Sequence, residues 1–371
     1  IDGARFADEH GFSSVWTPER HFHDFGGLYP NPSVTSAAVA AITHRIAIRS
    51  GSVVLPLHHP ARVTEEWSVV DQISGGRVGI SFASGWQPND FIFAPENYAN
   101  AKTVMLDNID LVRRLWRGET VGFAGHDGKE VAIQTYPRPL QKELPVWVTT
   151  AGNEDTFRMA GSIGANILTH LLGQTIEELT ARIDAYRDAR AKAGHAGPGE
   201  VTVMVHTFVG DSNDEVRELV RKPLTEYLRT SASLLKGFSH TWAAFKKRTD
   251  GTTVSDFDLD KISGAEMDDL LAFSFERYFQ SSGLFGTPDK CLDLVGKLHG
   301  AGVTEIACLI DFGVPADVAY AHLKDLDALR LRAQTEIATP PVATQSILDL
   351  VRQHAVTHLQ CTPSMAQMLM E

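Results

Sequence analysis

The sequence predicts an α/β fold, a TIM-type (β/α)8 barrel, and three observations lead to that class. Short runs rich in β-branched residues alternate with longer stretches of helical periodicity. Several short runs, such as AIRSGSVVLP and VTVMVHTFV, are almost continuously apolar, which is typical of parallel strands buried on both faces. Such alternation is compatible with two architectures, a barrel and an open doubly wound sheet. The open sheet usually carries GxGxxG after an early strand, and this sequence has none there, so the barrel is favoured.

Seven segments are predicted as strands, namely residues 14–17, 46–55, 77–83, 145–150, 166–170, 201–209 and 305–310. The helices between them each carry one apolar stripe, with spacings of three and four residues. The stripes are Val63, Trp67, Val70 and Ile73, then Met105, Ile109, Val112 and Trp116, then Ile176, Leu179, Ile183 and Tyr186. A barrel needs eight strands. Because the chain opens in a predicted helix over residues 2–10, we expect the first strand to precede Ile1.

Composition narrows the function classes. The chain has 371 residues and a formal net charge of −12, from 34 basic and 46 acidic side chains, so it lacks the basic excess of a nucleic-acid or anionic-membrane binder. No apolar run approaches the length of a membrane span, and the first residues do not resemble a signal peptide. Three widely spaced cysteines fit a reducing compartment. We therefore expect a cytoplasmic protein that binds neither nucleic acid nor membranes.

Two regions interrupt the alternation. Residues 230–275 form a long segment that is either an active-site lid or an ordinary surface excursion. After Glu336 the composition changes, and residues 340–371 contain a predicted helix (344–354) and strand (356–360) but are too few to fold alone. We therefore divide the chain into a barrel over 1–336 and a fragment of another domain over 340–371.

Barrel enzymes place their chemistry at the carboxyl ends of the strands. After the strand at 14–17 comes a charged run with His21 and His23, which is either a proton-transfer site or a solvated loop. The HxH spacing also suggests a metal ligand pair, but no third ligand lies nearby, so no metal is expected.

Two further strand ends suggest a ligand site. Small residues before Trp86 would let a flat ligand approach the backbone with the indole as a wall, or they form a tight turn with Trp86 in the local core. Gly152, Asn153 and Thr156 follow the strand at 145–150 and begin a helix. That start would bind an anion such as a phosphate, or Asn153 simply caps the helix.

Three runs resemble the bacterial luciferase-like, flavin-dependent monooxygenases: ERHFHDFGGLYPNPS, SGSVVLPLHHPARVTEEWSVVDQISGGRVGISFASGW and WVTTAGNEDTFRMAGSIGANILTHLLG. ASGWQPNDF and ILTHLLGQ look most like the subgroup embedded in nonribosomal peptide and polyketide synthases. The tail SILDLVRQHAVTHLQCTPSMAQML resembles part of an amino-acid adenylation domain.

The resemblance implies a barrel that binds reduced FMN and uses O2 as co-substrate. It implies a non-prolyl cis peptide at Gly51–Ser52 beneath the flavin ring. It places the ring and ribityl side at one strand end and the phosphate at a helix start. The residues at the ring and ribityl side are Ala83, Ser84, Gly85 and Trp86. Those at the phosphate are Gly152, Asn153 and Thr156.

The chain departs from the luciferases proper at two positions. Their first strand end has Glu-His-His, and the first of these histidines, which is catalytic, is Arg20 here. Arginine cannot act as a base near neutral pH, so proton handling passes to His21 or His23, or no base is needed. The luciferases bind the flavin phosphate with an arginine whose position is Ser84 here, so another cation must bind the phosphate in this chain.

Later histidines are more ambiguous. His170 and His206 lie at or within later strands, where each either faces the cleft or is structural.

From these features we expect an FMNH2- and O2-dependent monooxygenase domain of a peptide synthetase. Its substrate would be an amino-acyl or acyl intermediate, free or carrier-bound. Expected partners are a flavin reductase and the adenylation and carrier domains of the same synthetase. Two alternatives stay open: a deazaflavin-dependent hydride-transfer enzyme, and a non-catalytic flavin-binding or structural module.

Overall fold

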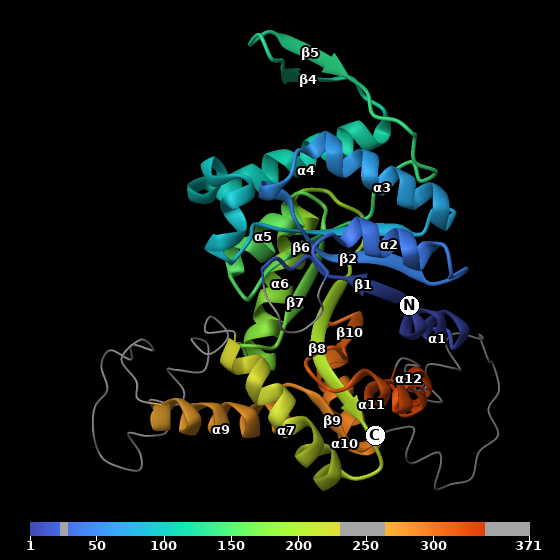
Figure 1. The fold of residues 1–371 in the computed structure, drawn as a ribbon, viewed down its shortest axis with the longest axis vertical. Coiled ribbons are helices and arrows are strands. Elements are labelled where there is room, and N and C mark those ends of the chain that lie inside the picture. Colours follow the sequence, from blue (N-terminus) through green and yellow to red (C-terminus); the bar gives the residue numbers. More distant parts are fainter. Residues whose placement is uncertain (23–28, 231–263, 338–371) are drawn as a thin grey trace, which may run out of the picture.

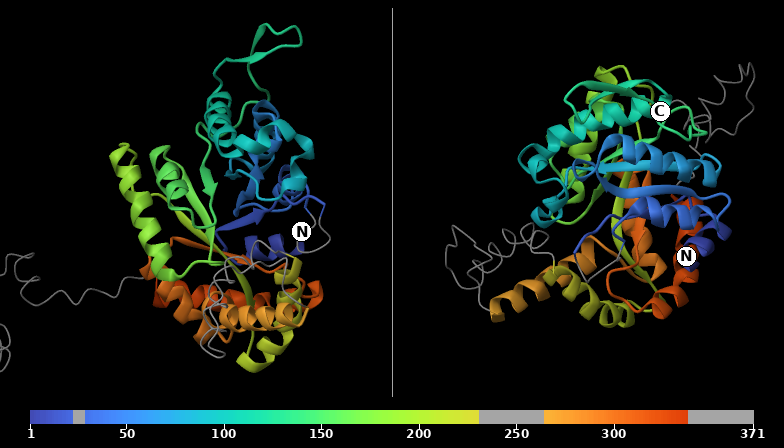
Figure 2. Two further views of the ribbon diagram at one scale, coloured as in Figure 1. Left: turned by 90° about the vertical axis from the view of Figure 1, so that its left-hand side faces the viewer. Right: turned by 45° about the horizontal axis from the view of Figure 1, so that its top comes forward.

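A parallel sheet that curls into a half-barrel forms the centre of the molecule, and helices cover its outer face (Figures 1 and 2). A computed structural model describes residues 1–22, 29–230 and 264–337. The predicted α/β barrel class is confirmed. The predicted helix and strand of the tail, and residues 231–263 of the segment at 230–275, lie outside the described residues. The rest of that segment from Gly264 belongs to a helix, α9.

The sheet follows the order β1-β2-β3-β6-β7-β8-β10, with a short strand β9 also paired to the far end of β8. All its ladders are parallel. Its strands are β1 (Ser14–Thr17), β2 (Ala47–Val54), β3 (Val78–Ala83), β6 (Val146–Thr149), β7 (Asn166–His170), β8 (Val201–Val209), β9 (Leu284–Gly286) and β10 (Glu305–Leu309). All seven predicted strands are present, and the structure adds β9, whose three residues are too few to show a pattern.

A second, separate hairpin pairs β4 (Val121–Ala124) with β5 (Glu130–Ile133) and projects from the body of the molecule (Figure 1). This hairpin was not predicted from the sequence. Its strands are mostly exposed, so they lack the apolar run that marks a buried strand.

The helices alternate with the strands along the chain and pack on the sheet through the predicted apolar stripes, except that Ile73 is 47% exposed and does not belong to its stripe. They are α1 (Asp2–Glu9), α2 (Pro32–Ala40), α3 (Pro60–Ser74), α4 (Ala101–Arg117), α5 (Glu154–Ser162), α6 (Ile176–Lys192), α7 (Asn213–Thr230), α9 (Gly264–Ser281), α10 (Pro288–Gly300), α11 (Ala316–Ala321) and α12 (Leu323–Glu336). Three 3-10 turns, η1 (Leu55–Leu57), η2 (Pro88–Phe93) and η3 (Pro95–Asn100), follow β2 and β3.

A polar cluster closes the amino-terminal end of the half-barrel. Arg49 of β2 forms an ion pair with Glu305 of β10, and both side chains are 14% exposed. The Arg49 guanidinium lies over the rings of Trp16 and Trp147, with its central carbon 5.2 Å and 4.3 Å from their centroids. Thr202 donates a further hydrogen bond to Glu305 at 2.9 Å. A ligand site inside this sheet must therefore open at the carboxyl ends of the strands.

Candidate active site

A buried carboxylate, Glu19, organises the carboxyl ends of β1 and β2. Its side chain is 0% exposed. Glu19 Oε1 accepts hydrogen bonds from His21 Nε2 at 2.8 Å and from His58 Nε2 at 2.6 Å, and Oε2 accepts one from the Val54 backbone N–H at 2.8 Å. We call these four residues the Glu19 cluster. Sequence reasoning identified His21 but missed Glu19 and His58.

The cluster holds opposite charges close together. Burial alone would raise the pKa of Glu19, but hydrogen bonds from His21 and His58 and the charge of His58 lower it below its ordinary value. Burial alone would lower the pKa of His58, yet the hydrogen bond to Glu19 and its charge raise it. Glu19 is thus anionic at neutral pH, and the protonated form of His58 is favoured.

His21 is the member of the cluster nearest an aromatic rim. Its Nε2 is directed at a carboxylate, so Nε2 carries the proton and Nδ1 is the basic nitrogen of the neutral ring. The ring is largely buried and meets the edge of Phe93, with centroids 5.0 Å apart. Phe22 stacks on Phe93 at 5.6 Å, and both phenyl rings are exposed. Phe22 and Phe93, with exposed Ile92 of the same turn, form what we call the aromatic rim.

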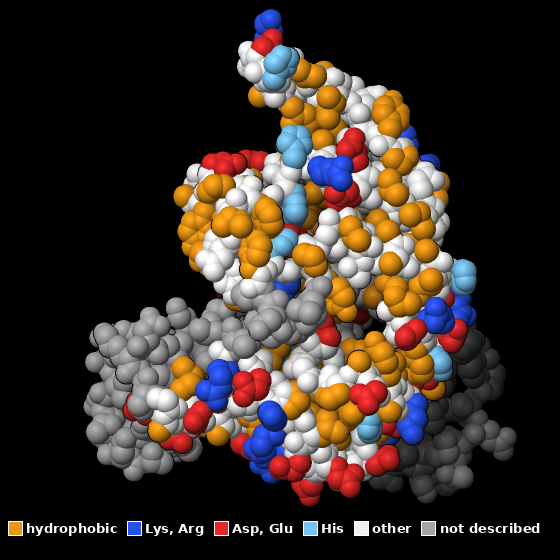
Figure 3. Space-filling model, in the orientation of Figure 1, with side chains coloured by type: hydrophobic (Ala, Val, Ile, Leu, Met, Phe, Trp, Pro, Cys, Tyr) orange, Lys and Arg blue, Asp and Glu red, His pale blue; other side chains and the backbone are white. Residues whose placement is uncertain are grey.

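The face of the molecule drawn in Figure 3 shows a row of histidine side chains with hydrophobic side chains on both sides. Lys or Arg and Asp or Glu side chains also lie beside this row, so imidazoles reach the surface on a face of mixed chemistry (Figure 3). Trp86 is also exposed (54%), so it is not part of a local core.

The next strands along the sheet carry a row of hydroxyl groups. Thr149 of β6 is hydrogen-bonded both to Ser52 of β2 and to Ser81 of β3, the latter at 2.7 Å. The Gly51–Ser52 peptide is cis, as the family resemblance implied. The pairing of β2 with β3 is irregular between Gly51 and Val53, so Ser52 stands outside the ladder.

Three glycines lie near the ends of neighbouring strands β2, β3 and β6, and at each of them a neighbouring side chain fills the space that a Cβ would occupy. A Cβ added to Gly51 would lie 3.2 Å from Trp16, and one added to Gly85 would lie 2.9 Å from Phe91. Gly85 and Gly152 have φ values of +87° and +103°, which favour glycine. We call these three positions the glycine seat, because only glycine leaves Trp16, Phe91 and Arg182 in place against the main chain.

The start of α5 lies beside this seat. Asn153 caps the helix and accepts a hydrogen bond from the Thr156 N–H at 3.1 Å, so the capping interpretation is confirmed. Thr156 lies in the first turn, as predicted. A residue that sequence reasoning missed, Arg182 of α6, lies close to Gly152.

Arg20 and His21 follow one another in sequence but belong to different surroundings. The Arg20 guanidinium lies 5.9 Å from the ring centroid of Tyr227 on α7. His206 of β8 packs against the same tyrosine ring and shares a 2.7 Å hydrogen bond between its Nδ1 and the hydroxyl of Tyr278. Arg20 thus borders the His206 surroundings, whereas His21 belongs to the Glu19 cluster.

The two later histidines are neutral. Burial lowers the pKa of His170 to about 4 and, together with the neighbouring His170 and Arg20, lowers that of His206 to about 3. Within the described residues, His170 Nδ1 and His206 Nε2 are buried and have no hydrogen-bond partner. The hydrogen bond between Nδ1 and the Tyr278 hydroxyl holds the His206 ring in place.

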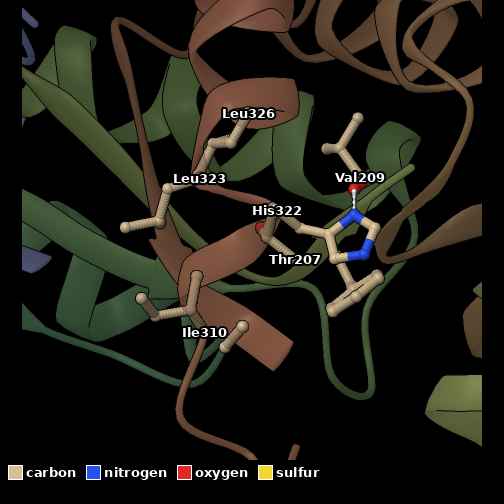
Figure 4. A pocket seen from close by; sticks show the side chains of 8 residues that line it. Thr207, Val209, Ile310, His322, Leu323 and Leu326 are labelled. Atoms are coloured by element: carbon tan, nitrogen blue, oxygen red, sulfur yellow. Dashed lines mark hydrogen bonds between the residues drawn. The ribbon is translucent and has the colours of Figure 1, made fainter. Parts of the chain in front are cut away.

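A small pocket between β8, β10 and α12 is separate from this site (Figure 4). Its lining is mainly aliphatic, and His322 Nδ1 is hydrogen-bonded to the carbonyl of Val209 at 3.1 Å. None of the predicted site residues lines it, so we do not assign it a ligand.

The remaining expectations concern His23, a metal site and a membrane-spanning helix. His23 lies outside the described residues. In the described ranges no group of three His, Cys, Asp or Glu side chains is placed to hold a metal ion. No helix within those ranges is long and apolar enough to cross a membrane.

A curled parallel sheet with a buried ionisable cluster at the carboxyl ends of its strands is the arrangement of a barrel enzyme. The family model described as luciferase-like monooxygenase matches residues 1–305. The chain therefore belongs to the luciferase-like monooxygenase family.

Individual relatives are distant. The alkanal monooxygenase alpha chain of Photorhabdus laumondii is 24% identical over 341 residues, covering 86% of this chain and 87% of that protein. The oxygenase component of the flavin-dependent trigonelline monooxygenase of Acinetobacter baylyi is 26% identical, covering 58% and 60%. The oxygenating constituent of 3,6-diketocamphane monooxygenase from Pseudomonas putida, solved in complex with FMN, is 18% identical with a TM-score of 0.67 and 91% coverage of both chains.

Proposed function

We propose that the chain is an FMNH2- and O2-dependent monooxygenase domain of a peptide synthetase that oxygenates an amino-acyl or acyl intermediate. The observation that carries the proposal is the Glu19 cluster at the carboxyl ends of β1 and β2. The cluster supplies a proton-carrying group at the end of the sheet where barrel enzymes bind their ligands. When bound, the reduced flavin supplies the electrons that reduce O2, of which one atom enters the substrate.

Each part of the site has a role in this proposal. Gly51 and Ser52 would lie beneath the flavin ring. Residues 83–86 would contact the ring and ribityl side, and Gly152, Asn153 and Thr156 would hold the phosphate. His21 takes or gives a proton at Nδ1, and Glu19 positions it through Nε2. The aromatic rim limits access of water to the reacting atoms.

The proposed partners have different support. The relative from Acinetobacter is named as an oxygenase component, which supports a separate reductase as the source of reduced flavin here. The adenylation-like sequence of residues 340–371 supports a synthetase setting with adenylation and carrier domains. Extending the reading frame on both sides would test this setting: flanking domains of another kind would contradict it.

Replacing Thr156 with alanine is expected to weaken FMN binding by about tenfold to a hundredfold, because a hydrogen bond to a charged group is lost. The stability of the apo-protein should change by only a few tenths of a kcal/mol, about the scale of helix propensity. Thr180→Ala, which removes a hydroxyl bonded within α6, is the matched control. Flavin fluorescence titration measures the effect, and an unchanged Kd for Thr156→Ala would remove that residue from the phosphate site.

The chemistry is tested by supplying reduced FMN and a panel of amino-acyl thioesters with and without O2. An oxygenase forms product only with O2, and one atom of 18O2 appears in it. Product formed without O2 from a reduced deazaflavin would instead support hydride transfer. FMN binding without any turnover across the panel would favour the non-catalytic module.

A further inference from the structure

The start of α5 is approached by a cation from the neighbouring helix. A Cβ added to Gly152 would lie 3.2 Å from Arg182 Nη1 and 3.3 Å from Gln174 Oε1. Only a glycine thus leaves the guanidinium in place against the main chain at the end of β6. The Arg182 side chain is 20% exposed, so it is neither a free surface charge nor a fully buried one.

Gln174 fixes the position of that guanidinium. It is buried, and its Nε2 donates to Thr169 Oγ1 at 3.1 Å and to the carbonyl of His170. Its Oε1 accepts a hydrogen bond from Arg182 Nη1 at 2.6 Å. Because both ends of the amide are engaged, the Gln174 side chain cannot rotate freely, and Arg182 is held in one orientation.

The nearby acidic residues only partly balance this charge. Glu178 approaches Arg182 no closer than 3.7 Å, and its carboxylate also caps α6 by accepting the Thr175 N–H at 3.0 Å. On α5 itself, Glu154 pairs with Arg158 at 2.6 Å on the exposed side of the helix. The position beside Gly152 therefore keeps a preorganised positive charge next to the first turn of α5.

We propose that Arg182 is the cation that binds the flavin phosphate in this chain. It would replace the luciferase arginine whose position is occupied by Ser84 here. The inference rests on the proposed function and deepens it. A guanidinium anchored through one nitrogen offers its other N–H groups to phosphate oxygens, which suits the fork geometry of arginine better than lysine. The helix start adds favourable potential for the same anion.

Comparison of FMN with riboflavin isolates the phosphate. In fluorescence titrations, Arg182→Gln should raise the Kd for FMN by about tenfold to a hundredfold and leave the Kd for riboflavin unchanged. Arg182→Lys should give an intermediate loss. Arg158→Gln, which removes an exposed arginine from α5, is the matched control and should bind both flavins as the parent does.

The outcomes separate the two proposals. If the parent protein binds FMN and Arg182→Gln binds it equally well, the assignment of Arg182 is overturned while the proposed function stands. An equal loss of riboflavin and FMN would also overturn it, because the residue would then support the fold and not the phosphate. If the parent protein binds neither flavin, both proposals fail.

Discussion

Glu19→Gln is expected to lower kcat/KM by about a hundredfold or more, within the range that general acid–base groups contribute. Glutamine keeps the shape of the side chain but has a single acceptor oxygen and no charge. It cannot accept from His21, His58 and the Val54 N–H together. His21 then has at most a neutral acceptor as its partner. His58 loses the charge and the hydrogen bond of Glu19 that raise its pKa, so burial is opposed only by the charge of Glu66.

The pH profile gives a readout that a merely structural role would not move. In the parent protein the pKa of His58 is raised, so His58 loses its proton above the ordinary value of about 6.5. In Glu19→Gln the deprotonation of His58 should shift to lower pH. Glu66→Gln is the control, since Glu66 acts on His58 through charge alone. Superimposable pH–rate profiles and His58 NMR titrations for parent and Glu19→Gln would contradict the role.

The same pair makes stability depend on pH. The lowered pKa of Glu19 gives stabilisation that is present above its unfolded pKa of about 4.3 and lost as pH falls through the folded value. The raised pKa of His58 gives stabilisation that is present below about pH 6.5 and lost as pH rises through the folded value. The contribution of the cluster to the free energy of unfolding is therefore complete between about pH 4.3 and 6.5.

Gly161→Ala is expected to destabilise the protein by about 3 kcal/mol, the upper part of the range for overpacking. Helices α5 and α6 meet here backbone to backbone: an added Cβ would lie 2.3 Å from the Tyr186 carbonyl oxygen and 3.0 Å from the Arg190 nitrogen. Neither atom belongs to a flexible side chain, so the helices must separate. That movement would also take Arg182 away from Gly152, and FMN affinity should fall with stability.

Gly300→Ala is the matched control, because this glycine ends α10 with nothing within 4 Å of the added methyl group. It should be neutral, or stabilising by up to about 1 kcal/mol. Denaturant unfolding of the two variants measures the difference. Similar free energies of unfolding for both would show that the contact between α5 and α6 can relax.

Much of the sheet could be predicted because its strands are buried runs. Residues 14–17, 166–170 and 201–209 begin and end as predicted, and the other four predicted strands differ by one residue at their ends. Strand β9 could not be found this way, since three residues carry no periodicity and its pairing depends on the far end of β8. The exposed hairpin was missed for the opposite reason, having too little apolar patterning.

The site was predicted less completely. The family resemblance located the cis peptide at Gly51–Ser52 and the helix start at Thr156. Glu19 and His58 lie 39 residues apart, and their contact depends on β1 pairing with β2, which no local pattern reveals. The available signal was that each follows the carboxyl end of a strand. Arg182 gave no such signal, because its role depends on the packing of two helices.

The seat and the rim differ in how freely they can change. Gly51, Gly85 and Gly152 lie against the side chains of Trp16, Phe91 and Arg182, which an added Cβ would displace. Phe22 and Ile92 are exposed on connecting segments, where substitutions usually cost little stability. Selection, natural or in the laboratory, can therefore alter which molecules enter by changing the rim while the cofactor seat is kept. New substrate ranges could arise in this fold without a new barrel.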